Sequence, residues 1–216
     1  MSALSYRIPR KLNFIKGRSF CDDCRQKLKW YDNIPLISFL LYHRKSRCCN
    51  QKISIRYPLI ELITAIGIFF LYPNFILILL FLLTFTILII DFEHQIIPDE
   101  LSWLVLLLAL FVMPYSYASL FVGFLSAFML LLVHLATRGR GMGLGDVKLA
   151  IALGVWLTAK QSPVWLFSSF LIGGLIGAIL LLLKRASLKT KIAFGPFLII
   201  AFWLVKLFYE KGFNFS

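Results

Sequence analysis

The chain has few acidic residues, few cysteines, and no internal repeat or low-complexity linker. Only 10 of its 216 residues are Asp or Glu, against 23 Lys and Arg, and its four cysteines all lie in the first 49 residues. The lack of repeats and linkers excludes a repeat array and a string of flexibly joined domains. Hydrophobic residues make up 60% of the chain, including 21 Phe, which predicts a polytopic membrane protein.

Seven apolar runs are predicted to form membrane-spanning helices, although several are shorter than the ~20 residues that usually cross a bilayer. They cover residues 59–73, 75–90, 101–113, 117–137, 147–159, 164–183 and 193–209. The expected fold is an all-α polytopic membrane protein with about seven transmembrane helices in residues 58–216. Residues 1–57 are expected to form a small, basic, cysteine-containing cytoplasmic domain.

Basic residues are distributed unevenly along the chain. Residues 1–57 hold 13 of the 23 Lys and Arg, and most others flank two later loops. The positive-inside rule places such segments in the cytoplasm. Counting spans from a cytoplasmic N-terminal region puts three loops on that side: 91–100, 138–146 and 184–192. A basic face beside anionic lipid therefore explains the net charge of +13 better than nucleic-acid binding does.

Two aspartates lie at the ends of predicted membrane helices, where an ionisable side chain is costly and indicates function. Asp91 follows an apolar run, and Asp146 lies in GMGLGDVKLA, where a glycine-rich loop enters the next run. Peptide hydrolysis by an acid pair needs one carboxylate to deprotonate water and one carboxylic acid to polarise the carbonyl. Asp91 and Asp146 are thus candidate catalytic residues of an aspartyl protease. Gly143 and Gly145 would allow unusual dihedral angles and close substrate approach.

Other polar residues have both structural and functional interpretations. Lys148 would favour an ionised Asp146 or extend to the lipid headgroups. Glu61, just inside an apolar run, would pair with Arg56 or a neighbouring helix, or would support the site. The remaining residues are interpreted mainly as structural: Asp99 as a helix N-cap or first-turn acid, Glu93 and His94 as solvated loop residues that could contact substrate or tune Asp91, and His134 as a packed or interfacial histidine.

The four cysteines form a CxxC pair, Cys21 and Cys24, and an adjacent pair, Cys48 and Cys49. This spacing indicates a zinc knuckle. Because adjacent cysteines rarely both bind one tetrahedral ion, three thiolates and another ligand such as His43 fit as well as four. Free or redox-active thiols are the alternative, whereas a stable disulfide is disfavoured in a reducing cytoplasm. A bound zinc would be structural, since so small a domain lacks a core of its own.

Seven sequence blocks resemble the type IV prepilin peptidases, membrane aspartyl proteases of the GxGD type and peptidase family A24. In order they read YRIPRK, CDDC, NIPLISFL, ISIRYPLIELITA, IDFEHQIIPDELSW, GMGLGDVKLAIALG and IAFGPFLII. The resemblance covers nearly the whole chain. It implies that Asp91 and Asp146 are the catalytic dyad of a multi-pass enzyme in the bacterial plasma membrane, with its catalytic face toward the cytoplasm.

The resemblance also implies the substrates, which would be type IV prepilins or pseudopilins. These would be cut after a glycine, between a short basic leader and an apolar helix. Family members can also methylate the new N-terminus with S-adenosylmethionine. The chain has no glycine-rich Rossmann fingerprint, which neither supports nor excludes that activity. Membrane lipid is the other expected partner, and nucleic acid is not expected.

The chain departs from the family pattern in two places. It begins MSALSYRIP where the family has a membrane helix, so either the start is truncated or seven helices suffice. Counting back from the RYP block aligns Cys49 with the last family cysteine and Ser46 with the other ligand position, which leaves Cys48 as the substitute.

A small transporter that uses Asp91, Asp146 and Glu61 is the alternative function. Both aspartates fall at one membrane face in the expected topology, which disfavours such a relay.

Overall fold

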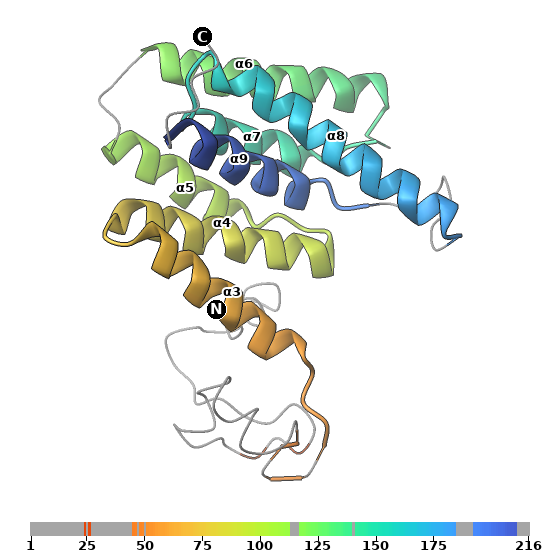
Figure 1. Ribbon diagram of the computed structural model, residues 1–216. Coiled ribbons are helices and arrows are strands. Elements are labelled where there is room, and N and C mark those ends of the chain that lie inside the picture. The colour runs from red at the N-terminus through yellow and green to blue at the C-terminus, as the bar shows by residue number, and fades with distance from the viewer. Residues whose placement is uncertain are drawn as a thin grey trace. The chain divides into compact units, whose positions relative to one another are not determined.

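The computed structural model divides the chain into two compact units, Met1–Leu82 and Leu83–Ser216 (Figure 1). The residues that it describes are Cys24, Gln26, Lys45, Ser46, Cys48, Cys49, 51–112, 117–139, 141–184 and 192–210. Most of the expected cytoplasmic domain, including Cys21 and His43, lies outside these residues. Each unit is described by itself.

The first unit contains helix α3 (Arg56–Leu71) and the beginning of helix α4 (Phe75–His94). The side chain of Asn74 caps α4, because its Oδ1 accepts a hydrogen bond of 3.1 Å from the backbone N–H of Leu77. The ring of Phe81 lies so close to Gly67 that any side chain at position 67 would overlap it. The glycine therefore allows α3 to pack tightly against the first turns of α4.

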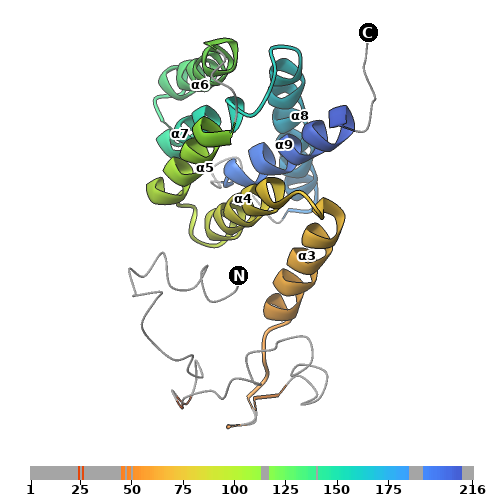
Figure 2. The same cartoon turned by 90° about the vertical axis from the view of Figure 1, so that its left-hand side faces the viewer.

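The second unit is built around the short helix α7. It contains the end of α4, followed by α5 (Asp99–Val112), α6 (Tyr117–Ala136), α7 (Leu144–Gly154), α8 (Gln161–Leu182) and α9 (Gly195–Glu210). Helix α7 packs against α5, α6 and α9, and α8 packs against α6 and α9. Figure 2 shows α7 between α5 and α6, with α9 on its other side.

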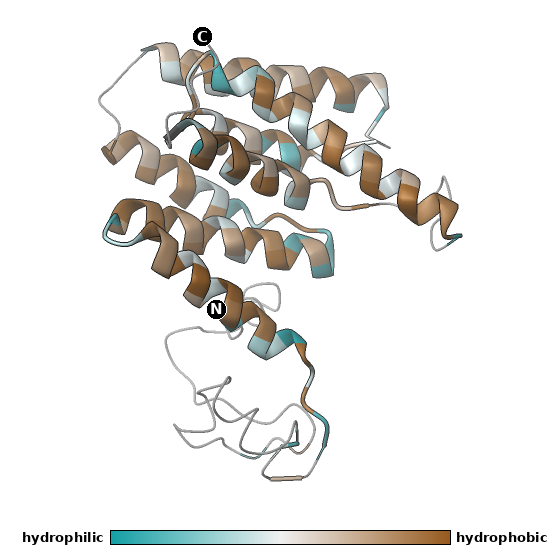
Figure 3. Cartoon of the chain, in the orientation of Figure 1, coloured by the Kyte–Doolittle hydropathy of each residue, from teal (hydrophilic) through white to brown (hydrophobic). Residues whose placement is uncertain are grey.

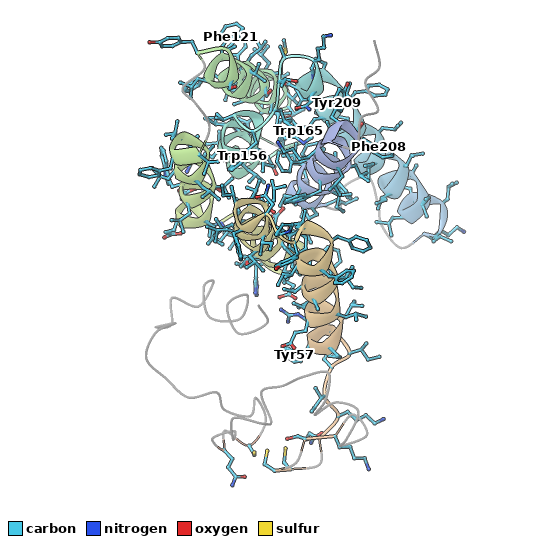
Figure 4. The ribbon with its side chains drawn as sticks, turned by 60° about the vertical axis from the view of Figure 1, so that its left-hand side comes forward. Tyr57, Phe121, Trp156, Trp165, Phe208 and Tyr209 are labelled. Atoms are coloured by element: carbon cyan, nitrogen blue, oxygen red, sulfur yellow. The ribbon has the colours of Figure 1, made fainter. Side chains whose placement is uncertain are left out.

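Polar groups connect the helices of the second unit through its interior. The hydroxyls of Ser126 on α6 and Ser162 on α8 are 2.7 Å apart and buried. Three tryptophan indoles also donate hydrogen bonds to a helix. Trp156, in the turn after α7, donates to the Val105 carbonyl of α5 (3.3 Å), Trp165 of α8 to the Leu198 carbonyl of α9 (2.8 Å), and Trp203 of α9 to the Thr84 hydroxyl of α4 (3.0 Å). Figure 4 shows Trp156 and Trp165 directed inward among the helices. In apolar surroundings such bonds fix which helices are neighbours.

The outer surface of the helices is strongly apolar. Most helical residues in Figure 3 are hydrophobic, and large side chains such as Phe111, Tyr117 and Phe121 are mostly exposed. Three helices, α4, α6 and α8, are long and apolar enough to cross a membrane, and α9 is a shorter apolar helix. A surface of this kind fits contact with lipid.

The sequence correctly predicted helices at all seven apolar runs, and the described residues contain no β-strand beyond a single bridge between Lys45 and Lys52. Seven membrane-spanning helices are not confirmed. With 14 and 11 residues, α5 and α7 are only about 21 Å and 16 Å long. In α7 most side chains, including Leu149 and Leu153, are buried by neighbouring helices. Its apolar sequence therefore reflects burial in protein, which composition alone does not distinguish from burial in lipid.

The first prediction concerns the close approach of α6 and α7. A Cβ atom at Gly154 would lie 2.8 Å from the Cα of Gly123, a backbone atom that cannot move aside. We expect Gly154→Ala to lower the free energy of unfolding by roughly 1–3 kcal/mol through overpacking.

The matched control is Gly174→Ala on α8, where an added Cβ meets no atom within 4 Å. We expect no loss of stability there, because alanine is the better helix former. Thermal unfolding of both variants in the same detergent tests this pair. Equal stability of Gly154→Ala and the wild type would contradict the described packing of α6 on α7.

Candidate active site

Asp146 lies in the first turn of α7, where the loop 141–143 enters the helix. Gly143 is the cap residue, and its backbone N–H donates a 3.0 Å hydrogen bond to Asp146 Oδ2. Free N–H groups at a helix start commonly bond to an acidic side chain three residues on. The contact holds a carboxylate that is only 7% exposed in one orientation.

Asp91 lies near the end of α4 and is 4% exposed. The backbone of Gly195, the first residue of α9, hydrogen-bonds to its carboxyl group. A Cβ atom at position 195 would overlap Asp91 Oδ2. Among the described residues Asp91 Oδ2 has no hydrogen-bond partner. A buried oxygen without a partner is rare and calls for a functional explanation.

The two carboxylates lie near each other in the second unit, close enough for their charges to interact. Ile97, in the segment between α4 and α5, contacts the backbone beside both. A Cβ atom added at Gly145 would lie 3.2 Å from Ile97 Cβ, and one added at Gly195 would lie 3.1 Å from Ile97 Cδ1. Ile97 therefore lies between the first turn of α7, which carries Asp146, and the start of α9, which lies beside Asp91.

The two glycines before Asp146 do not have the unusual dihedral angles that were expected of them. Gly143 has an extended backbone, with φ −81° and ψ 156°, and the described glycine with a left-handed backbone is Gly139, at φ +71°. Gly145 is needed for space instead, because a side chain there would press on Ile97. Gly145 thus provides close packing beside Asp146, and neither glycine has a left-handed backbone.

Lys148 forms an ion pair with Asp99, at 2.7 Å between Nζ and Oδ2. Both side chains are about half exposed, at 52% and 51%, so the pair contributes at most about 1 kcal/mol. Asp99 is the first residue of α5, as its interpretation as a helix-start residue predicted. The described partner of Lys148 is therefore Asp99, and the pair joins the start of α5 to the first turns of α7.

The other candidate residues lie in different places. Glu61 is half-buried on α3, in the first unit. Glu93 and His94 are neighbours in the last turn of α4, 3.9 Å apart. His134 is half-buried on α6, and its Nδ1 lies 2.7 Å from the carbonyl oxygen of Met142.

Sequence reasoning assigned no role to Gly195 or Ile97. The signal for Gly195 was present in IAFGPFLII, where a glycine opens the last apolar run. Nothing in the sequence distinguished Ile97 from the many other isoleucines.

Three of the four cysteines form a cluster in the first unit. The sulfur atoms of Cys24, Cys48 and Cys49 all lie within 4.8 Å of one another. The Sγ atoms of Cys24 and Cys48 are 3.2 Å apart, and Ser46 Oγ lies 3.0 Å from Cys48 Sγ. Both adjacent cysteines thus contribute a sulfur atom to one cluster. Cys21 lies outside the described residues.

Two family models together match residues 1–178. The bacterial peptidase A24 N-terminal domain matches residues 1–75, and the type IV leader peptidase family matches residues 75–178. The second match includes both Asp91 and Asp146.

The curated relatives carry one name, prepilin leader peptidase/N-methyltransferase. The protein from Neisseria gonorrhoeae is 37% identical over 91% of this chain and 73% of its own length. Those from Vibrio cholerae and Pseudomonas aeruginosa are 33% and 35% identical, over 93% and 92% of this chain and 88% and 74% of their own lengths. No solved structure matches the chain significantly. On these matches, the chain belongs to the type IV leader peptidase family.

Proposed function

We propose that the protein is a membrane aspartic endopeptidase that removes the leader from type IV prepilins or pseudopilins, with Asp91 and Asp146 as its catalytic carboxylates. The observation that carries the proposal is the pair of buried, neighbouring carboxylates on α4 and α7, in a chain of the leader peptidase family. Membership of this family does not favour the transporter alternative.

The chemistry requires the pair to act as a unit. Two carboxylates at close range share one proton, so one is ionised while the other is an acid. The ionised carboxylate takes a proton from water as the water oxygen attacks the scissile carbonyl carbon, and the acid donates its proton to the carbonyl oxygen. When the tetrahedral intermediate collapses, the carbon–nitrogen bond breaks and the leaving amine takes the proton of the pair. A hydroxyl of the intermediate returns its proton to the other carboxylate, so the pair ends with one proton, as it began. Asp91 Oδ2, which has no described partner, is available to bond with the water.

The substrate is another membrane-inserted chain. Its basic leader would stay at the cytoplasmic face, where the Lys and Arg around them place the loops that precede α7 and α9. Asp146 lies at the end of the first of these loops, and Asp91 lies near Asp146 in the second unit, so the cut would fall at that face. This topology makes the enzyme a multi-pass protein of the bacterial plasma membrane, with residues 58–216 as the peptidase domain and 1–57 on the cytoplasmic side.

The second prediction tests the dyad by replacing each acid with its amide. Asp91→Asn and Asp146→Asn should each lower cleavage of a co-expressed prepilin at least about a hundredfold, because an amide cannot exchange the proton. The control is Asp99→Asn, the same change at an exposed acid that pairs with Lys148, and we expect it to cleave normally. Substrate size on a gel and its N-terminal mass measure the result. Normal cleavage by either dyad variant in membrane-inserted form would refute the assignment.

The third prediction concerns the space beside Asp91. In Gly195→Ala the new methyl group would overlap the Asp91 carboxylate and displace it. We expect the rate to fall roughly tenfold or more, since small displacements of reacting groups are costly. Gly177→Ala is the matched control, because its Cβ would meet only Ile192, at 3.9 Å. Equal rates for the two variants would show that Asp91 does not depend on the contact with Gly195.

We further propose that the cysteine cluster holds a structural zinc ion. Three sulfur atoms within 4.8 Å of one another fit the thiolate corners of a tetrahedral zinc site. Cys24, Cys48 and Cys49 would provide these, with Cys21 of the CxxC pair as the candidate fourth ligand. Bound zinc would cross-link a segment that is too small for a core of its own.

The fourth prediction separates thiolate ligands from neighbouring groups. Cys24→Ser and Cys48→Ser should each abolish zinc binding, whereas Ser46→Ala should keep about one zinc per chain, because only thiolates are assigned as ligands. Zinc content of purified protein, measured by mass spectrometry, provides the test. Wild-type protein without zinc would favour the free-thiol alternative, and loss of zinc in Ser46→Ala would make the Ser46 position a ligand.

Methylation of the new N-terminus is a second candidate activity, favoured by the names of the relatives, which include N-methyltransferase. S-adenosylmethionine would supply the methyl group. A gain of about 14 Da on the processed substrate would reveal the activity.

A further inference from the structure

The last turn of α6 carries a histidine whose ring reaches the loop before α7. The Nδ1 atom of His134 lies 2.7 Å from the carbonyl oxygen of Met142, a residue that is itself buried. A carbonyl oxygen can only accept, so the ring nitrogen must carry the hydrogen and donate it. This requirement fixes the tautomer of neutral His134, and the charged ring donates from the same atom.

The accepting carbonyl belongs to the same peptide group as the N–H that bonds to Asp146. The peptide between Met142 and Gly143 has its C=O directed to His134 and its N–H directed to Asp146 Oδ2, at 3.0 Å. A peptide group is planar and rigid. His134 therefore reaches the Asp146 carboxylate through a single rigid group, and rotation of this group would weaken both hydrogen bonds.

The rest of the turn holds the ring in place. Gly139, with φ +71°, donates its N–H to the carbonyl of His134 at 2.8 Å, and a Cβ at position 139 would lie 3.2 Å from the His134 ring. The hydroxyl of Thr137 accepts a hydrogen bond of 3.2 Å from the N–H of Gly141. These contacts stabilise the turn that leads from the end of α6 to Met142.

We propose that His134 is a positioning residue for Asp146, acting through the peptide group between Met142 and Gly143. Donation to the carbonyl polarises the peptide and makes its N–H a stronger donor to the carboxylate. The same bond sets the orientation of that N–H and so the direction of Asp146. The inference rests on the proposed function, since it assigns His134 to the site that contains Asp146.

The test compares two replacements of His134 in the full-length protein. His134→Asn keeps an N–H donor near the position of Nδ1, whereas His134→Phe keeps a ring and removes the donor. We expect His134→Phe to lower kcat for prepilin cleavage roughly tenfold with KM little changed, because the loss falls on the reacting group and not on substrate binding. His134→Asn should recover most of the rate.

The control for a general loss of stability is Ser126→Ala on the same helix. It removes the buried hydrogen bond to Ser162 and has no described contact with the Asp146 loop. We expect its kcat to match the wild type even if its melting temperature falls. Equal kcat for His134→Phe and the wild type, or an equal loss in His134→Phe and Ser126→Ala, would overturn the inference.

A second measurement does not depend on turnover. In protein with 15N-labelled glycine, the amide proton of Gly143, identified by its absence in Gly143→Ala, should move upfield in His134→Phe as its hydrogen bond weakens. It should stay near the wild-type position in His134→Asn and in Ser126→Ala. An unchanged Gly143 signal in His134→Phe would overturn the inference. A wild type that shows this link but cleaves no prepilin would instead refute the proposed function.

Discussion

The second unit depends on the burial of α7 by other helices. Helix α7 has only eleven residues, and its apolar side chains are covered by α5, α6 and α9. The backbones of α6 and α7 meet at Gly123 and Gly154, where a single added carbon would collide. Because α7 is fixed on three sides, the residue in its first turn, Asp146, has a defined place relative to Asp91 on α4. Both the proposed chemistry and the role of His134 depend on that placement.

A carboxylate in an apolar helical unit needs nearby donors, and both aspartates find them in the backbone at a helix start. Gly143 begins α7 beside Asp146, and Gly195 begins α9 beside Asp91. Helix starts offer free N–H groups and favour negative charge. At position 195 only glycine fits, because a Cβ there would overlap the Asp91 carboxylate, whereas a Cβ at position 143 would make ordinary contact with Asp146 Oδ2, at 3.5 Å. Two helix starts thus provide an environment in which a pair of acids can exchange one proton.

The helices could be predicted from the sequence to within a few residues, because apolar runs and the turns between them are local signals. Their relation to the membrane could not, since Leu149 and Leu153 read the same whether protein or lipid covers them. Asp91 and Asp146 were identifiable as candidates from the cost of an acid in an apolar run. Their proximity was not, because it depends on how α4 and α7 pack. The same holds for Ile97, whose importance comes only from the two glycines that it contacts.

The nearness of the two carboxylates is the central claim, and thiol bridging tests it most directly. In the double variant Asp91→Cys/Asp146→Cys, a short bis-methanethiosulfonate reagent should join the two positions within one molecule. Peptide mapping by mass spectrometry would identify the bridged fragments, with the two single variants as controls. Efficient bridging between positions 91 and 146 is the result that the account predicts. Labelling of both thiols by separate reagent molecules, with no bridge between them, would contradict it.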